Sequence, residues 1–189
     1  EMKLEEMIRR CALLMGLDTA FADQDAVRTE SEQSVYERLK MGINEAYHKV
    51  AVNVLRPIAE QEVQLDQACC FKIDGLEKCF ADVCRIRVNG HERRFRELAG
   101  RIQVFASPGS TAAVSYYYVP EKLEQPEDEP VLSEQEVPAV VYIYGALSLY
   151  ATGEGKFYEA ATWDERFLNA VSNVHRLSRR CRMPARRWI

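Results

Sequence analysis

The spacing of the apolar residues changes twice along this chain, and each change limits what the segment can fold into. Near the N-terminus apolar residues recur every three or four positions, which is the period of an amphipathic helix. Between residues 58 and 120 they fall in short runs rich in β-branched and aromatic residues, with the period of a strand. After residue 134 the helical period returns. The sequence therefore predicts helices at both ends and an antiparallel β region between them.

The N-terminal part predicts two helices. Met7, Ile8 and Cys11 indicate a short first helix, and Gly16 stands where a left-handed C-cap is needed. Apolar residues from Val35 to Val54 indicate a second helix, which Pro57 bounds because proline disfavours helical backbone in the residue before it.

A hairpin is predicted at Asn89-Gly90, between the runs VCRIRV and HERRF, because its two-residue turn needs positive φ at both positions. His91 is then a surface residue of the hairpin and not a ligand. The pairs expected on one side of this hairpin are Val88 with His91, Ile86 with Arg93, and Cys84 with Phe95.

The segment that leaves the β region is acidic and rich in proline. Residues 121–138 contain seven acidic residues and one lysine. We expect this segment to lie outside the core, because it has little apolar surface to bury. Ser133 and Glu136 have capping-box spacing, and Pro138 favours a helix start nearer Val137.

These elements predict an α+β fold: a helical bundle, made of the N-terminal helices and a C-terminal αα-hairpin, with an inserted small antiparallel β region. The predicted parts are a discontinuous helical domain at 1–57 and 134–177, a β insertion at 58–120, an acidic connector at 121–133 and a basic C-terminal arm at 178–189.

The stretch TGEGKFYEA, from Thr152 to Ala160, superficially resembles a phosphate-binding loop. A Walker loop needs glycine where Tyr150 stands and a hydroxyl residue where Phe157 stands, and it should follow a strand and not a helix. We therefore interpret Gly153 and Gly155 as the C-cap and turn of the αα-hairpin, and Lys156 as a solvent-facing residue.

The sequence contains no pattern typical of catalysis or metal binding. His48, His91 and His175 lie on different predicted elements, and the six cysteines include no CxxC pair. We predict free thiols in a reducing cytosol, no cofactor, no metal and no enzymatic activity. The charged N-terminal segment also lacks the apolar core of a signal peptide, so a soluble protein is expected.

Charge is distributed unevenly along the chain. The formal net charge is -4, yet residues 176–189 hold six arginines and no acid. Such an arm could dock on nucleic acid or on an acidic protein surface, or it could be a solvated tail. Trp188 could anchor the arm in a partner's pocket or stack on single-stranded bases.

The order of these elements resembles that of bacteriophage head-tail connector (adaptor) proteins, and especially the tail tubular protein A type with a β insertion. The likeness is carried by IRRCALLMGL near the start, YYYVPEKL at 116–123, and EDEPVLSEQEVPAVVYIYGALSLYATGEGKFYEAATWDERF at 127–167.

The resemblance implies a non-enzymatic virion protein of the phage neck. Such a subunit assembles in the host bacterial cytoplasm into a ring, commonly a dodecamer. The subunit alone could be a monomer. The ring lies under the portal protein, extends the DNA channel and receives the tail or neck proteins. DNA would pass through it without specific binding, since an acidic body repels phosphates.

The family's C-terminal arm often reaches onto the portal, and the resemblance implies the same of the arm here. The alternative is a nucleic-acid-binding accessory or regulatory protein that acts through this arm. The residues expected to bind the partner are Arg176, Arg179, Arg180, Arg182, Arg186, Arg187 and Trp188.

Overall fold

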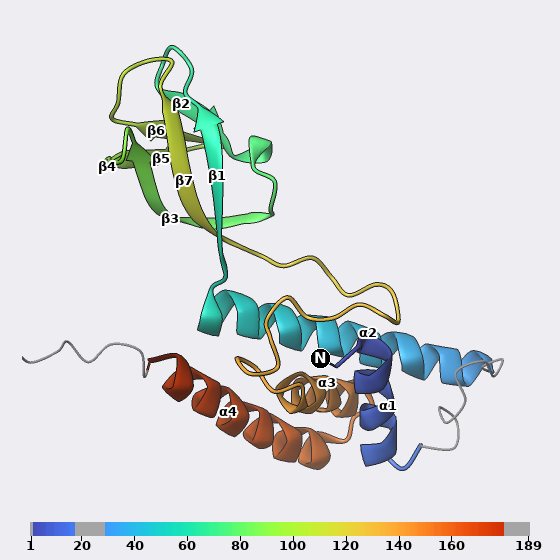
Figure 1. The fold of residues 1–189 in the computed structure, drawn as a ribbon. Helices are drawn as coiled ribbons and strands as arrows, with labels where there is room; N and C mark the ends of the chain where they lie inside the picture. Colours follow the sequence, from blue (N-terminus) through green and yellow to red (C-terminus); the bar gives the residue numbers. More distant parts are fainter. Residues whose placement is uncertain (1, 18–28, 180–189) are drawn as a thin grey trace, which may run out of the picture. The chain divides into compact units, whose positions relative to one another are not determined.

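The structure is a computed structural model that describes residues 2–17 and 29–179, with side chains as far as Val174. The chain divides into two compact units (Figure 1). One, the helical unit, comprises the residues before Arg56 and from Lys122 onwards, and the other, the β unit, comprises Arg56–Glu121.

The helical unit begins with α1 (Leu4–Leu14) and α2 (Glu30–Val50), which continues as a π-helical turn over Ala51–Leu55. The cap predicted for the first helix is confirmed, because Gly16 has φ +73°. Thr29 and Glu32 form a reciprocal capping box at the start of α2.

The second half of the helical unit is a hairpin of α3 (Val140–Gly153) and α4 (Phe157–Arg179), as predicted. Helix α3 lies between α2 and α4, and α1 packs against both α2 and α3 (Figure 1). The helix start predicted near Val137 is displaced to Val140, although Ser133 N–H does donate to the Glu136 carboxylate at 3.2 Å.

Helices α2 and α3 approach closely because small residues meet at their crossing. A Cβ atom added to Gly145 would lie 2.6 Å from Ala46 Cβ and 3.1 Å from the Phe167 ring. A Cβ atom added to Gly42 would lie 3.0 Å from Ala146 Cα. Around this crossing is a continuous core that includes Tyr47, Tyr142, Ile143, Leu147 and Phe167.

Most residues of the acidic connector, 121–133, are exposed, as expected, but two of its leucines belong to the core. Leu123, Leu132 and Val137 are buried against the helices. Asn44 of α2 holds the connector in place: its side chain accepts from Leu123 N–H at 2.7 Å and donates to the Leu123 carbonyl at 3.0 Å. Leu123 and Leu132, with Val137 just after the connector, therefore join the core of the helical unit although acidic residues surround them in the sequence.

The β unit contains two antiparallel sheets. The four-stranded sheet has the order β1-β7-β3-β4 and the three-stranded sheet has the order β2-β6-β5. The strands are β1 (Ile58–Gln64), β2 (Cys70–Lys72), β3 (Phe80–Val88), β4 (His91–Glu92), β5 (Phe95–Leu98), β6 (Arg101–Val104) and β7 (Thr111–Tyr118), with a 3-10 turn at Ile73–Gly75.

The predicted fold class, a helical bundle with a small β insertion, is wrong in its account of the β part. The seven strands form a substantial sheet core of their own. The underestimate arises because no strand contributes more than four buried residues and several contribute none, whereas the buried residues of both sheets form one cluster. The buried set includes Leu65, Phe71, Val83, Ile86, Val88, Ile102, Val104, Val114 and Tyr116.

The predicted hairpin is confirmed at its turn and fails farther along. Asn89 and Gly90 have φ values of 53° and 77°, and Val88 pairs with His91. Pairing ends after Glu92 except for one bond from Arg93 N–H to the Ile86 carbonyl. Phe95 then pairs with Val104 in the second sheet and not with Cys84.

Candidate partner-binding groove

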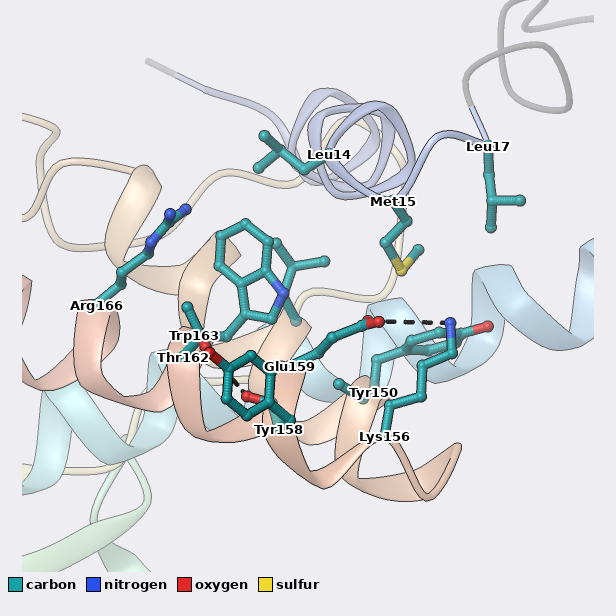
Figure 2. Close-up of a pocket in the computed structure, with 12 residues that line it drawn as sticks. Leu14, Met15, Leu17, Tyr150, Lys156, Tyr158, Glu159, Thr162, Trp163 and Arg166 are labelled. Carbon is teal, nitrogen blue, oxygen red and sulfur yellow. Dashed lines mark hydrogen bonds and ion pairs between the residues drawn. The ribbon is translucent and has the colours of Figure 1, made fainter.

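A groove of about 510 Å³ lies in the helical unit where the end of α1 meets the α3–α4 hairpin (Figure 2). Its wall combines aliphatic and aromatic side chains with a few charges. The lining residues are Leu14, Met15, Leu17, Leu147, Tyr150, Ala151, Lys156, Tyr158, Glu159, Thr162, Trp163 and Arg166.

The groove lies between the end of α1 and the first turns of α4, which begins directly after the hairpin turn. Gly155 takes φ +73°, which glycine adopts without strain, and α4 begins two residues later. Ala160, Phe167 and Val174 repeat every seven positions on α4 and are buried, whereas Trp163, between the first two, is only half-buried. The unfilled space beside Trp163 is the groove.

Aromatic rings form the floor. The Trp163 ring lies 5.7 Å from the Tyr144 ring between centroids, and the Arg166 guanidinium lies 4.7 Å from the Trp163 ring. The pKa of Tyr150 is raised above its ordinary value, first by burial and then by Glu154, with Arg38 opposing the shift.

Large apolar side chains surround the groove and are open to solvent. Leu14 is 49 % exposed and Tyr158 is 88 % exposed. Leu13 and Phe157, which are next to these residues in the sequence but do not line the groove, are 60 % and 72 % exposed. Exposed apolar residues that gather in one place are typical of a protein-binding surface.

The charges of the groove stand at its edge. Lys156 Nζ lies 3.9 Å from Glu159 Oε2, both side chains being more than half exposed (Figure 2). Together with Arg166 this leaves the edge with more positive than negative charge. The polar side chains of the groove are those of Tyr150, Lys156, Tyr158, Glu159, Thr162 and Arg166.

The structure confirms that the glycines of TGEGKFYEA turn one helix back on the next. The lysine of this stretch is exposed, as expected, and also lines the groove. The groove was not predicted from the sequence. The available signal was the seven-residue repeat of α4, which places Trp163 at the edge of the buried stripe, next to exposed aromatic residues.

The side chains of the arm residues predicted to bind a partner lie outside the described part of the chain. Arg176 and Arg179 belong to α4, but their side chains are outside the described residues. Arg180, Arg182, Arg186, Arg187 and Trp188 lie wholly outside them. Their role remains a prediction.

The other candidate residues are scattered. His91 is exposed on the hairpin, as predicted, and His48 is half-buried on α2. Within residues 2–17 and 29–174, no three His, Cys, Asp or Glu side chains come together as metal ligands. The cysteines in this part of the chain are free, namely Cys11, Cys69, Cys70, Cys79 and Cys84.

Comparison with protein families and with curated proteins identifies no relative of this chain. No protein-family model matches the chain, and the search of curated proteins finds no match. Among the described helices, none combines the length and apolar character that crossing a membrane requires.

Proposed function

We propose that this protein is a structural head-tail connector of a bacteriophage neck. Copies of the chain form a ring under the portal protein, extend the DNA channel and provide the platform for tail attachment. The observation that carries the proposal is the fold of residues 116–167: the segment that resembles connectors leaves the sheet, packs along α2 and turns into a hairpin beside an exposed apolar groove.

The connector segment is held firmly enough to serve as a fixed surface. Besides the Asn44 contacts, Leu4 N–H donates to the Asp128 carbonyl at 2.9 Å and Lys40 Nζ donates to the Glu124 carbonyl at 2.8 Å. The Asp128 carboxylate accepts from the amides of Gln125 and Glu124, which lowers its pKa. A surface fixed in this way loses little entropy on binding.

In this proposal the groove of one copy binds the acidic connector segment, residues 121–133, of a neighbouring copy. Val131 is 62 % exposed, and its N–H donates to the Tyr47 hydroxyl at 3.0 Å, so it is presented at a fixed place. Carboxylates flank it in the sequence, including Glu129 and Glu134. This apolar residue among acids complements an apolar groove with a positively charged edge.

The test is assembly of the purified full-length chain with the portal protein of the same phage. We expect a discrete ring complex in electron micrographs and in native mass spectrometry, also where the chain alone is monomeric. Leu14→Glu and Val131→Arg should each prevent ring formation, because they place charge in the apolar contact.

The matched control is Leu168→Glu, since Leu168 is 51 % exposed on α4 but does not line the groove. This variant should assemble like the unmodified chain. A persistent absence of any ring complex, both in the mixture and in virions, would sink the connector function. Rings that tolerate Leu14→Glu and Val131→Arg would leave the connector function standing and refute the proposed contact.

A further inference from the structure

The outer face of the three-stranded sheet in the β unit has an unusual composition. Strand β5 pairs with β6 and β6 pairs with β2, so residues at matching positions lie in rows across the sheet. The bond from Phe105 N–H to the Arg94 carbonyl, at 3.0 Å, extends the β5–β6 pairing by one row. The residues on the outer side are Arg94, Arg96, Leu98, Arg101, Gln103, Phe105, Cys70 and Lys72.

This outer side, the basic face, carries four cations and no carboxylate. All four cationic residues, Lys72, Arg94, Arg96 and Arg101, are exposed. None of them takes part in an ion pair within the described part of the chain. Guanidinium groups without a protein carboxylate are available to an external anion.

An aromatic ring stands among these cations. Phe105 is 61 % exposed at the end of β6, although a phenylalanine in a sheet normally packs inward. Ile102 and Val104 on the same strand are buried on the other side, so the core does not need Phe105. Leu98, 39 % exposed, adds apolar surface to the same face.

Acidic groups lie beside the basic face and not on it. Glu97 belongs to the alternate side of β5, in the row of Ile102. Glu62 and Asp66 line a groove of about 430 Å³ that Lys72 and Arg101 also border. Asp66 is engaged by the backbone amides of Ala68 and Cys70, each at 2.8 Å. Because neither Lys72 nor Arg101 forms an ion pair with these acids, all four cations of the basic face remain available, with Arg94 in the row of Phe105.

We propose that the basic face binds single-stranded nucleic acid. Guanidinium groups contact the phosphates, and the exposed Phe105 ring stacks on a base, which a duplex could not offer without unpairing. An acidic protein surface would satisfy the arginines but gives no role to an isolated exposed ring. This binding is additional to the connector function and uses a different unit of the chain.

The net charge of the chain gives no indication of the basic face. Residues 56–121 contain nine basic and nine acidic residues, so the β unit is neutral in sum and polarised in space. The expectation that DNA is repelled by the body of the protein therefore does not extend to the β unit.

The experiment is fluorescence anisotropy with the full-length chain, a labelled 20-nucleotide oligothymidylate and a 20-base-pair duplex. Four phosphate contacts predict a log K against log salt slope of about -3 on the single strand. Phe105→Ala should weaken single-strand binding about 5- to 150-fold, and Phe105→Tyr should retain it. Replacing Arg94, Arg96 and Arg101 by Gln should reduce the slope by about 2.

Two controls separate the basic face from other arginines. Arg87→Gln removes an exposed arginine from the four-stranded sheet, outside the basic face. It should leave both the affinity for the single strand and the slope of log K against log salt unchanged. A chain that ends at Arg179 should keep the dependence on Phe105. Circular dichroism confirms that each variant is folded.

Three results would overturn the inference. They are no single-strand binding at 50 mM salt, equal binding of the unmodified chain and the folded Phe105→Ala variant, and duplex binding as tight as single-strand binding. Selective loss with Phe105→Ala together with a reduced slope for the arginine variant would establish it.

Discussion

The crossing of α2 and α3 gives a sharp prediction for Gly145→Ala. The added methyl carbon would lie 2.6 Å from Ala46 Cβ, about 1 Å closer than the roughly 3.5–4.0 Å of a normal carbon contact. The added methyl carbon would also lie 3.1 Å from the Phe167 ring, which is closer than an ordinary contact. The two helices must separate, or the Phe167 ring must leave its position.

The expected magnitude follows from two opposing effects. Overpacking a core costs about 1–3 kcal/mol and occasionally more, and the added methyl group would be too close to both Ala46 and Phe167. Alanine in a helix is favoured over glycine by about 1 kcal/mol. We expect Gly145→Ala to lower the free energy of unfolding by about 2 kcal/mol.

The assay is urea unfolding followed by circular dichroism at 222 nm, a signal to which the helical unit contributes most. Gly153→Ala is the matched control, because Gly153 ends the same helix and has no atom within 4 Å of an added Cβ. It should raise stability by about 0.4–1 kcal/mol.

A second variant tests the cause. Ala46→Gly removes the methyl group that lies closest to the one Gly145→Ala adds, so Gly145→Ala should destabilise the Ala46→Gly background less than it destabilises the unmodified chain. The coupling free energy from this cycle isolates the contact. If Gly145→Ala were as stabilising as Gly153→Ala, the close approach of α2 and α3 would be refuted.

Three further predictions concern the helical unit. Asn44→Ala should lower the free energy of unfolding by about 1–3 kcal/mol, because it leaves the buried Leu123 amide without its partner; urea titration against Lys40→Ala checks this. Thr29→Ala should cost about 1 kcal/mol through loss of the α2 N-cap, whereas Thr152→Ala should cost less, in the same titration. Burial raises the pKa of Cys11 from 9.0 to about 12, so the thiol's contribution to stability is complete below pH 9 and is lost as pH rises towards 12. The difference in unfolding free energy between the unmodified chain and Cys11→Ala should shrink over that pH range, and a constant difference would contradict the burial of Cys11.

Features set by a few neighbouring residues could be predicted from the sequence. Gly16, Gly155 and the Asn89-Gly90 pair all have positive φ, because the backbone at these turns requires it and few other residues tolerate it. The helices follow from apolar periodicity in the same way. In each case the decisive interaction spans fewer than about five residues.

Features that depend on distant pairing could not be predicted in this way. Phe95 continues the alternation of the hairpin, and nothing local shows that it pairs with Val104 instead of Cys84. Leu123 and Leu132 are isolated among acids, and their burial depends on packing with residues of the helices that are distant in the sequence. The size of the sheet core in the β unit and the burial of Leu123 and Leu132 were therefore missed for the same reason.

The groove and the basic face illustrate the same limit for function. Trp163 and Phe105 are single aromatic residues in ordinary sequence surroundings, and only tertiary structure shows that one borders an open groove and the other stands among unpaired arginines. Because they belong to different units, Leu14→Glu should abolish ring assembly without changing single-strand binding, and Phe105→Ala should do the reverse. Loss of both activities in either folded variant would mean that ring assembly and nucleic-acid binding share one surface, contrary to the assignment made from the two units.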